Sequence, residues 1–242
     1  QLGYAFYRVN DYQKAIEQFN KIISGKNAVA QNAYYHLADS YLQTQQQTAA
    51  LNAFKRASEM KFDAVIAEDA LLNYARLSYT LGNSYESPSA VLQRFIKTYP
   101  KNEAVTAIEE LLLDSYVNSQ NFDAALDLFE KLSASQFNEA RQKVFYLKAT
   151  SLYKTGQFKE AIEFYASAIK AHSNAYIIAT SLYWQAQAYF ELKEYALALE
   201  TFLEAKAQPK FASLDGAELF DYHVGYAYFN LKNYPQALTS FE

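Results

Sequence analysis

The sequence predicts an all-α protein, a solenoid built from repeated pairs of antiparallel helices. Three observations predict this class. One arrangement of small and large residues recurs along the whole chain, apolar residues fall on helical stripes at i, i+4 and i+7, and no run alternates with a period of two. We therefore expect residues 1–242 to form one continuous array.

The recurring arrangement has three positions. A small residue, usually Ala, is followed four positions later by a ring or Leu and is preceded nine positions earlier by another ring or Leu. Successive small residues lie 35 to 39 positions apart. A unit of this size cannot bury its apolar face alone, so neighbouring units must stack. The sets are Phe6/Ala15/Phe19, Tyr41/Ala50/Phe54, Tyr79/Pro88/Leu92, Tyr116/Ala125/Phe129, Leu152/Ala161/Tyr165, Tyr189/Ala198/Phe202 and Tyr228/Ala237/Phe241.

Each unit is expected to hold two helices joined by a tight turn, and the fifth unit shows the plan most clearly. Phe145 and Ala149 share one helical stripe, and Gly156 then ends that helix. Ala161 and Tyr165 lie on one face of the next helix, which completes the hairpin. The expected units are approximately 1–28, 29–62, 63–101, 102–137, 138–174, 175–212 and 213–242, with the first and last truncated.

Further positions recur in register with this plan. The first helix carries a small residue at Gly3, Ala38, Ala149, Ala186 and Gly225. A turn residue and a ring follow at Asn10–Tyr12, Asn83–Tyr85, Asn121–Phe122, Gly156–Phe158, Glu194–Tyr195 and Asn233–Tyr234. This pattern resembles the tetratricopeptide repeat (TPR) family over essentially the whole chain. The resemblance implies a right-handed superhelical solenoid, with first helices on a concave face and second helices on a convex one.

Some positions depart from the family pattern. Gln47 replaces the ring of the second unit, and Arg76 and Pro88 stand where the third unit should have small residues. The start of the second helix in that unit is therefore left open. The third unit ends in FIKTYP, similar to the TPR subtype of bacterial cell-envelope proteins. This likeness favours a bacterial source, and the periplasm or cell envelope over the cytoplasm.

The composition argues against several functions. A net charge of −4 with scattered Lys and Arg argues against a nucleic-acid partner. The absence of Cys excludes disulfides, a thiol nucleophile and thiolate zinc sites. His36 and His223 fall five units apart, and no catalytic motif surrounds them. No apolar run approaches the roughly 20 residues of a membrane span. We expect no enzyme activity, no metal, no cofactor and no direct membrane insertion.

Candidate binding residues follow from the implied concave face. Tyr and Trp dominate binding hot spots because they give large contact area at low entropy cost. The expected groove is aromatic, with polar groups between the rings. The same rings would also fit packing between units, and the pattern leaves both interpretations open. The candidate residues are Tyr35, His36, Asp39, Tyr74, Asp114, Tyr146, Tyr183, Trp184, Gln187, Tyr222, His223 and Tyr226.

Two functions remain open at this level. The first is a non-catalytic scaffold that binds a peptide or helix of a partner protein in the aromatic groove. The second is a structural or self-associating spacer within a longer repeat protein, whose binding site lies elsewhere. The chain starts and stops inside repeats, so we expect a piece of a longer protein with apolar faces at both ends. End-to-end association of copies is the partner that this second hypothesis predicts.

Overall fold

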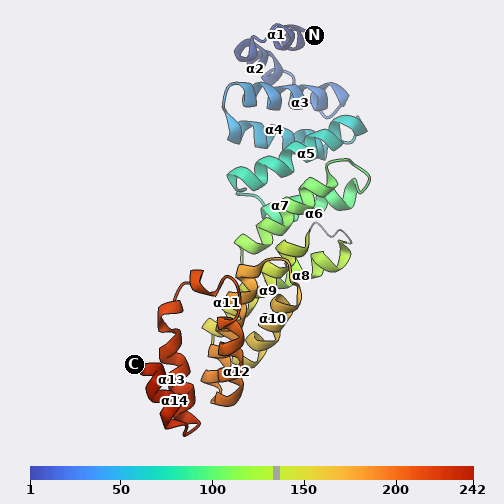
Figure 1. The fold of residues 1–242 in the computed structure, drawn as a ribbon. Helices are drawn as coiled ribbons and strands as arrows, with labels where there is room; N and C mark the ends of the chain where they lie inside the picture. The colour runs from blue at the N-terminus through green and yellow to red at the C-terminus, as the bar shows by residue number, and fades with distance from the viewer. Residues whose placement is uncertain (133–136) are drawn as a thin grey trace. The chain divides into compact units, whose positions relative to one another are not determined.

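Residues 1–132 and 137–242 are described by a computed structural model, and the regular structure in these ranges is helical throughout (Figure 1). The predicted all-α class is confirmed. The helices alternate along the chain between a first and a second member of each pair. We call the odd-numbered helices α1 to α13 first helices and the even-numbered helices α2 to α14 second helices.

The chain divides into two compact units, and the division falls inside the fourth predicted repeat. Unit 1 comprises Gln1–Asn118. Within unit 1 each helix packs against the next one in sequence. Its helices are α1 (Leu2–Arg8), α2 (Tyr12–Asn20), α3 (Ala28–Gln43), α4 (Gln47–Glu59), α5 (Ala64–Leu81), α6 (Pro88–Thr98) and α7 (Val105–Asn118).

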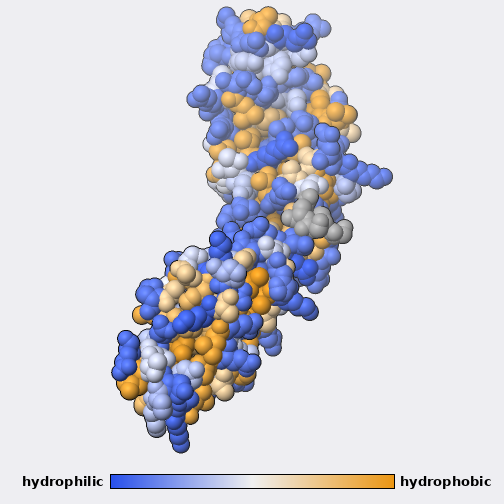
Figure 2. Space-filling view, in the orientation of Figure 1, coloured by the Kyte–Doolittle hydropathy of each residue, from blue (hydrophilic) through white to orange (hydrophobic). Residues whose placement is uncertain are grey.

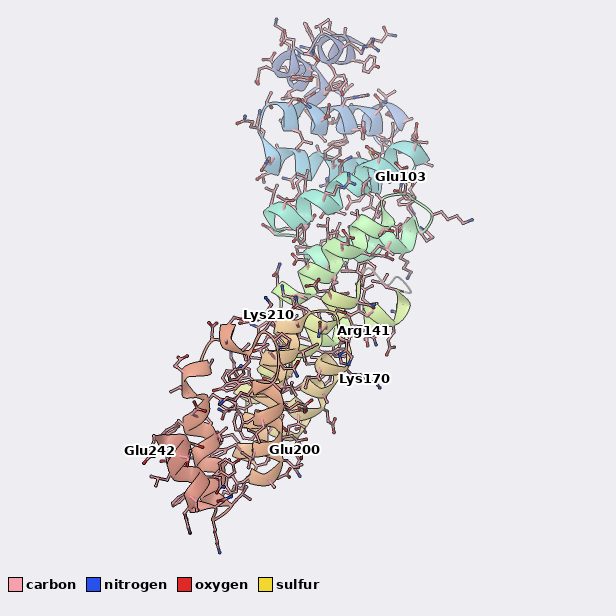
Figure 3. All side chains as sticks on the ribbon, viewed as in Figure 1. Glu103, Arg141, Lys170, Glu200, Lys210 and Glu242 are labelled. Carbon is pink, nitrogen blue, oxygen red and sulfur yellow. The ribbon has the colours of Figure 1, made fainter. Side chains whose placement is uncertain are left out.

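Unit 2 comprises Ser119–Glu242. Neighbouring helices pack in sequence order here as well, and two short 3₁₀ turns lie between α12 and α13. The elements are α8 (Phe122–Lys131), α9 (Asn138–Lys154), α10 (Phe158–Lys170), α11 (Ala175–Glu191), α12 (Tyr195–Lys206), η2 (Phe211–Ser213), η3 (Ala217–Leu219), α13 (Phe220–Asn230) and α14 (Tyr234–Phe241). The charged residues labelled in unit 2, such as Arg141, Lys170 and Glu200, are all exposed (Figure 3).

Every second helix buries its fourth residue, and six of the seven also bury the eighth. The fourth is Ala in six of the seven second helices and lets the paired backbones approach, while the eighth is a Phe or Tyr ring. Six of these rings are at most 4% exposed. A Cβ added to Gly225 on α13 would lie 2.6 Å from the eighth ring of α14, Phe241. The small residue on the first helix is therefore required by the ring that packs against it.

The third pair corrects two expected positions. Pro88 is the first residue of α6, capped by the Ser87 side chain, so it is not the small residue of this helix. The fully buried fourth and eighth residues are Val91 and Phe95. The small position of α5 is taken by the fully buried Ala75, and Arg76 is exposed. The shift in α6 arises because six residues, 82–87, join this pair where three join each of the others.

The three-residue turns share one backbone conformation. The middle residue has a positive φ each time, at Asn10, Gln45, Gln120, Gly156, Lys193 and Lys232. In five of these turns the next N–H donates to a carbonyl five residues earlier, as Gln157 does to Leu152 at 2.9 Å. This bond caps the first helix and reverses the chain. Only Gly156 adopts the left-handed conformation here without the steric cost that a Cβ brings.

Two buried glutamines join consecutive helix pairs in the same way, one in each compact unit. The Gln31 side chain donates to the carbonyls of Ala57 and Met60 and accepts from the N–H of Asp63 at 2.8 Å. Gln142, in the equivalent place on α9, donates to the Ala168 carbonyl and accepts from the Asn174 N–H at 2.7 Å. Each amide thus ties the end of its own second helix to the start of the next first helix.

We expect Gly156→Ala to lower the free energy of unfolding by about 1 kcal/mol, because Gly156 has a φ of +77° and its surroundings are otherwise open. Lys193→Gly, the reverse change at the equivalent turn, should leave stability unchanged or raise it. Urea denaturation of both variants measures this. A stabilised Gly156→Ala protein would contradict the turn geometry.

Candidate functional site

The first helices of unit 1 are joined by tyrosine-to-aspartate hydrogen bonds. The Tyr7 hydroxyl on α1 donates to Asp39 on α3 at 2.6 Å, and the Tyr35 hydroxyl on α3 donates to Asp69 on α5 at 2.5 Å. A third such bond runs from Tyr79 on α5 to Asp114 on α7. Each first helix of this unit is therefore linked to the next by a charge-assisted bond.

These contacts disfavour ionisation of the tyrosines. Burial, followed by the hydrogen bond to a neighbouring carboxylate, raises the pKa of Tyr7 and of Tyr35. The hydrogen bond to Asp114 is the main cause that raises the pKa of Tyr79. The negative charge of Asp39 also acts on Tyr35 and raises its pKa further. Tyr35 therefore lies within the field of two carboxylates, Asp39 and Asp69.

Aromatic rings gather around His36, on the same helix as Asp39. Tyr4 stacks on Tyr7 with ring centroids 6.1 Å apart, and both approach the His36 imidazole at 5.1 and 4.8 Å. Tyr35 meets the same imidazole edge-on at 5.5 Å. Tyr4 keeps 43% of its surface exposed. We call Tyr4, Tyr7, Tyr35, Asp39 and Asp69 the tyrosine–aspartate face.

Four candidate residues lie seven positions before the end of their first helix, where the side chain packs between helix pairs. His36 stacks on Phe19 of the preceding α2, and His223 stacks on Phe202 of α12, each with centroids 6.0 Å apart. Trp184 packs on the cluster around Tyr165 and meets Tyr153 at 5.3 Å. Tyr74 is fully buried. The expectation that Tyr74 is a groove residue is wrong, because its hydroxyl is held by Asn83 and Glu86 beneath the 82–87 turn.

Tyr183 and Gln187 are also buried, at 4% and 7% exposed, which corrects their expected place in an open groove. The Tyr183 hydroxyl lies 3.0 Å from His223 Nδ1 and donates to the Gly216 carbonyl at 3.4 Å. Gln187 Nε2 lies 2.7 Å from the same His223 nitrogen. The segment that connects α12 to α13 covers these side chains, because Leu214 belongs to the same buried cluster.

The remaining candidates of unit 2 differ in exposure. Tyr222 and Tyr226 on α13 are 52% and 40% exposed, with centroids 4.7 Å apart. Both approach the Phe241 ring on α14. Tyr146 is half-buried against Tyr165. In unit 2 the apolar surface gathers over α11 and α12 in the view of Figure 2. Leu197 and Leu203 of α12 are exposed.

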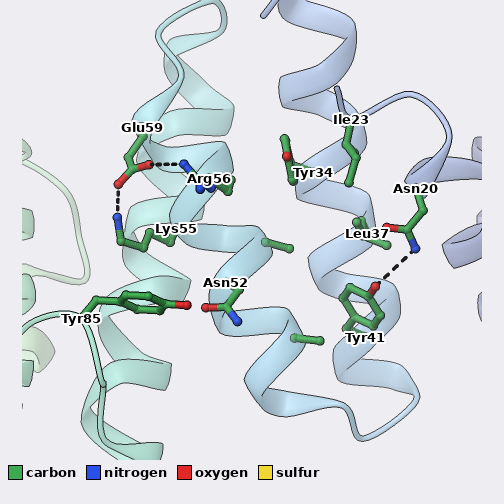
Figure 4. A pocket seen from close by; sticks show the side chains of 12 residues that line it. Asn20, Ile23, Tyr34, Leu37, Tyr41, Asn52, Lys55, Arg56, Glu59 and Tyr85 are labelled. Atoms are coloured by element: carbon green, nitrogen blue, oxygen red, sulfur yellow. Dashed lines mark hydrogen bonds and ion pairs between the residues drawn. The ribbon is translucent and has the colours of Figure 1, made fainter. Parts of the chain in front are cut away.

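A hollow of about 540 Å³ lies on unit 1 between α2, α3 and α4 (Figure 4). Polar groups from Asn20, Tyr34 and Asn52 line it, and Tyr85 of the 82–87 turn borders it. Its two cations, Lys55 and Arg56, both pair with Glu59. No periodic pattern predicts this hollow, because it depends on the six-residue turn that brings Tyr85 beside α4.

Sequence reasoning also missed Tyr7, Tyr79 and Asp69 as members of the site. Their partners lie 32 to 35 residues away in the chain. A Tyr and an Asp separated by about one repeat length are the signal that could have found them. The described ranges 1–132 and 137–242 contain no group of His, Asp and Glu arranged to hold a metal ion. Among these residues we also find no helix with the length and apolarity of a membrane span.

The sequence matches the tetratricopeptide repeat family model at residues 1–61, 111–176 and 146–212, together more than half of the chain. The protein therefore belongs to the tetratricopeptide repeat family. The predicted family and its solenoid fold class are confirmed, and the family's general role is that of a protein-interaction scaffold. The matches leave out the third pair, where the turn is three residues longer than elsewhere.

Solved structures of the same fold class resemble the chain. The C-terminal part of a TPR repeat-containing protein from Cytophaga hutchinsonii is 18% identical, with a TM-score of 0.48, over 99% of this chain and 91% of that one. MamA from AMB-1 is 20% identical, with a TM-score of 0.38, over 72% and 95%. A Rap protein complexed with competence and sporulation factor is 16% identical, with a TM-score of 0.38, over 94% and 56%. No curated protein gives a significant match.

The two packed histidines make folding stability depend on pH. Burial lowers the pKa of His36 against the opposing effect of Asp39, and burial lowers the pKa of His223, which faces Tyr183, Gln187 and Tyr222. The folded state therefore favours neutral imidazoles. The contribution of these histidines to the free energy of unfolding is present above the ordinary histidine pKa of about 6.5. It is lost as the pH falls through their lowered pKa values in the folded state.

We expect the free energy of unfolding to fall between neutral and mildly acidic pH, and to fall less in His36→Leu than in the unchanged protein. Leucine occupies the equivalent places at Leu111 and Leu147, and His36 Nδ1 is buried with no hydrogen-bond partner among the described residues. Leu147→His should make the pH dependence steeper. Urea denaturation at several pH values compares the proteins, and identical profiles for all three would contradict the assignment.

Proposed function

We propose that this chain is a non-catalytic interaction module that binds a segment of a partner protein along its first helices. The observation that carries the proposal is the exposure of tyrosine rings there: Tyr4 at 43%, Tyr222 at 52% and Tyr226 at 40%. The eighth rings of six second helices are, in contrast, at most 4% exposed. A ring left in water on a rigid helix offers apolar contact at little entropic cost.

The candidates that pack between helix pairs take a supporting role in this proposal. Trp184, His36 and His223 pack against rings of the preceding pair, and Tyr183 is bonded to His223. Their contribution is to fix the positions of the first helices. The partner segment would contact Tyr4 and Tyr35 in unit 1, and Tyr222 and Tyr226 in unit 2, each unit considered by itself.

Binders selected from a library of displayed random peptides test the proposal. We expect Tyr4→Ala, or the pair Tyr222→Ala and Tyr226→Ala, to weaken selected binders by about 2–4 kcal/mol, as for aromatic hot spots. Tyr85→Ala is the matched control, because Tyr85 is 65% exposed but lies beside the hollow near α4. Calorimetric titration measures each affinity. Binders that lose affinity only with Tyr85→Ala would move the binding surface to that hollow.

A second function, association between copies of the chain, is supported by one specific observation. Phe241, the eighth ring of α14, is 46% exposed although its equivalents are buried. Leu238, the fifth residue of the same helix, is 59% exposed, whereas its equivalent Leu51 on α4 is 4% exposed. This face of α14 would take a further helix pair, and a second copy offers exposed apolar residues at α1 and its C-cap, Leu2 and Val9.

We expect Leu238→Lys to abolish any concentration-dependent association, because a charge cannot be buried without a partner. Leu203→Lys, at a 45% exposed position on α12, is the control that should leave association unchanged. Sedimentation velocity over a range of concentrations measures both variants. A chain that stays monomeric at every concentration excludes this second function.

A further inference from the structure

Charge is segregated between the two sets of helices in unit 1. Its first helices contain six acidic and two basic residues, whereas its second helices contain two acidic and five basic residues. In unit 2 the first helices contain three acidic and four basic residues, so acidic first helices are found in unit 1 and not in unit 2. The acids of the first helices in unit 1 are Asp39, Glu68, Asp69, Glu109, Glu110 and Asp114.

The aspartates of this surface have no cationic partner. Within the part of the chain that the structure describes, no Lys or Arg forms an ion pair with Asp39, Asp69 or Asp114. Their hydrogen bonds come from neutral groups, namely tyrosine hydroxyls and the amides of Asn73 and Asn118. The negative charge of these aspartates is therefore oriented by its donors but not neutralised.

The tyrosine rings lie beside these carboxylates. The charges of Asp39 and Asp69 both act on Tyr35. Tyr7 donates a hydrogen bond to Asp39, and Tyr4 stacks on Tyr7. The face of a tyrosine ring attracts a cation, and a carboxylate forms charge-assisted bonds with ammonium and guanidinium groups. A Lys or Arg side chain can lay its apolar stem against Tyr4 and Tyr7 while its charged head reaches Asp39 or Asp69. Rings and carboxylates thus favour the same ligand group.

We propose that the tyrosine–aspartate face of unit 1 selects a Lys- or Arg-rich segment of the partner protein. The charge complementarity between the unpaired aspartates and a basic segment chooses this partner chemistry. This inference rests on the proposed binding function and adds the class of segment to it.

Labelled peptides of a Lys-Gly-Ser repeat and a Glu-Gly-Ser repeat test the proposal by fluorescence anisotropy at low and high salt. The Lys peptide should bind, and the Glu peptide should not. The double variant Asp39→Asn and Asp69→Asn should weaken binding of the Lys peptide at least about tenfold. Asparagine still accepts the tyrosine hydrogen bonds, and circular dichroism checks that the variant is folded.

The matched control is the double variant Glu160→Gln and Glu163→Gln, which removes the same charge from exposed positions on α10 of unit 2. Removing these charges weakens only the long-range attraction, which salt screens. Beyond that loss, the affinity of the control variant for the Lys peptide should change less than about twofold. An equal loss in both double variants, preference for the Glu peptide, or no binding of the Lys peptide would overturn the inference.

The same design separates this inference from the proposed function. Library-selected binders that depend on Tyr4 but carry no excess of Lys and Arg would refute the basic-segment inference and leave the binding function intact. Binders that do not depend on Tyr4, Tyr222 or Tyr226 would refute the binding function itself.

Discussion

The eighth rings of the second helices α2 to α12 hold each helix pair against the next, and the other features of the fold depend on this contact. Phe19 of α2 is covered by His36 of α3, and Phe202 of α12 is covered by Phe220 and His223 of α13. The ring needs a small residue on its own first helix, as Gly225 and Phe241 show by their close approach. Interior packing of this density fixes the position of each first helix.

The packing in turn decides which side chains remain available for binding. A first helix presents one row to the preceding ring and an adjacent row to solvent. His36 falls in the packed row, and Tyr35, one position earlier, reaches across to Asp69 on the neighbouring first helix. A shift of one residue therefore separates a structural role from a role at the surface. The electrostatic character of unit 1 follows from the row that stays outside the core.

Repeat register and helical periodicity predict the fold well, because the small residues and rings recur at fixed distances in the sequence. They fail at α6, where the six-residue turn shifts the fourth and eighth positions of the helix from Pro88 and Leu92 to Val91 and Phe95, although Leu92 is buried as well. They also predict the candidate site only partly. Tyr74 and Tyr183 have the same chemistry as Tyr222, and burial by the 82–87 turn and by the segment before α13 distinguishes them. Such coverage depends on irregular segments, which carry no periodic signal.

The tyrosine-to-aspartate bonds have a consequence for the evolution of the chain. Tyr7, Tyr35 and Tyr79 each donate a hydrogen bond to a carboxylate in the following repeat. The three donors lie at different positions within their own helices. Exchanging the order of repeats would leave a hydroxyl facing no acceptor and a carboxylate without its donor. The repeats of unit 1 are therefore not interchangeable modules. Duplication or deletion of a single repeat would require compensating substitutions in its neighbours, which preserves the present order.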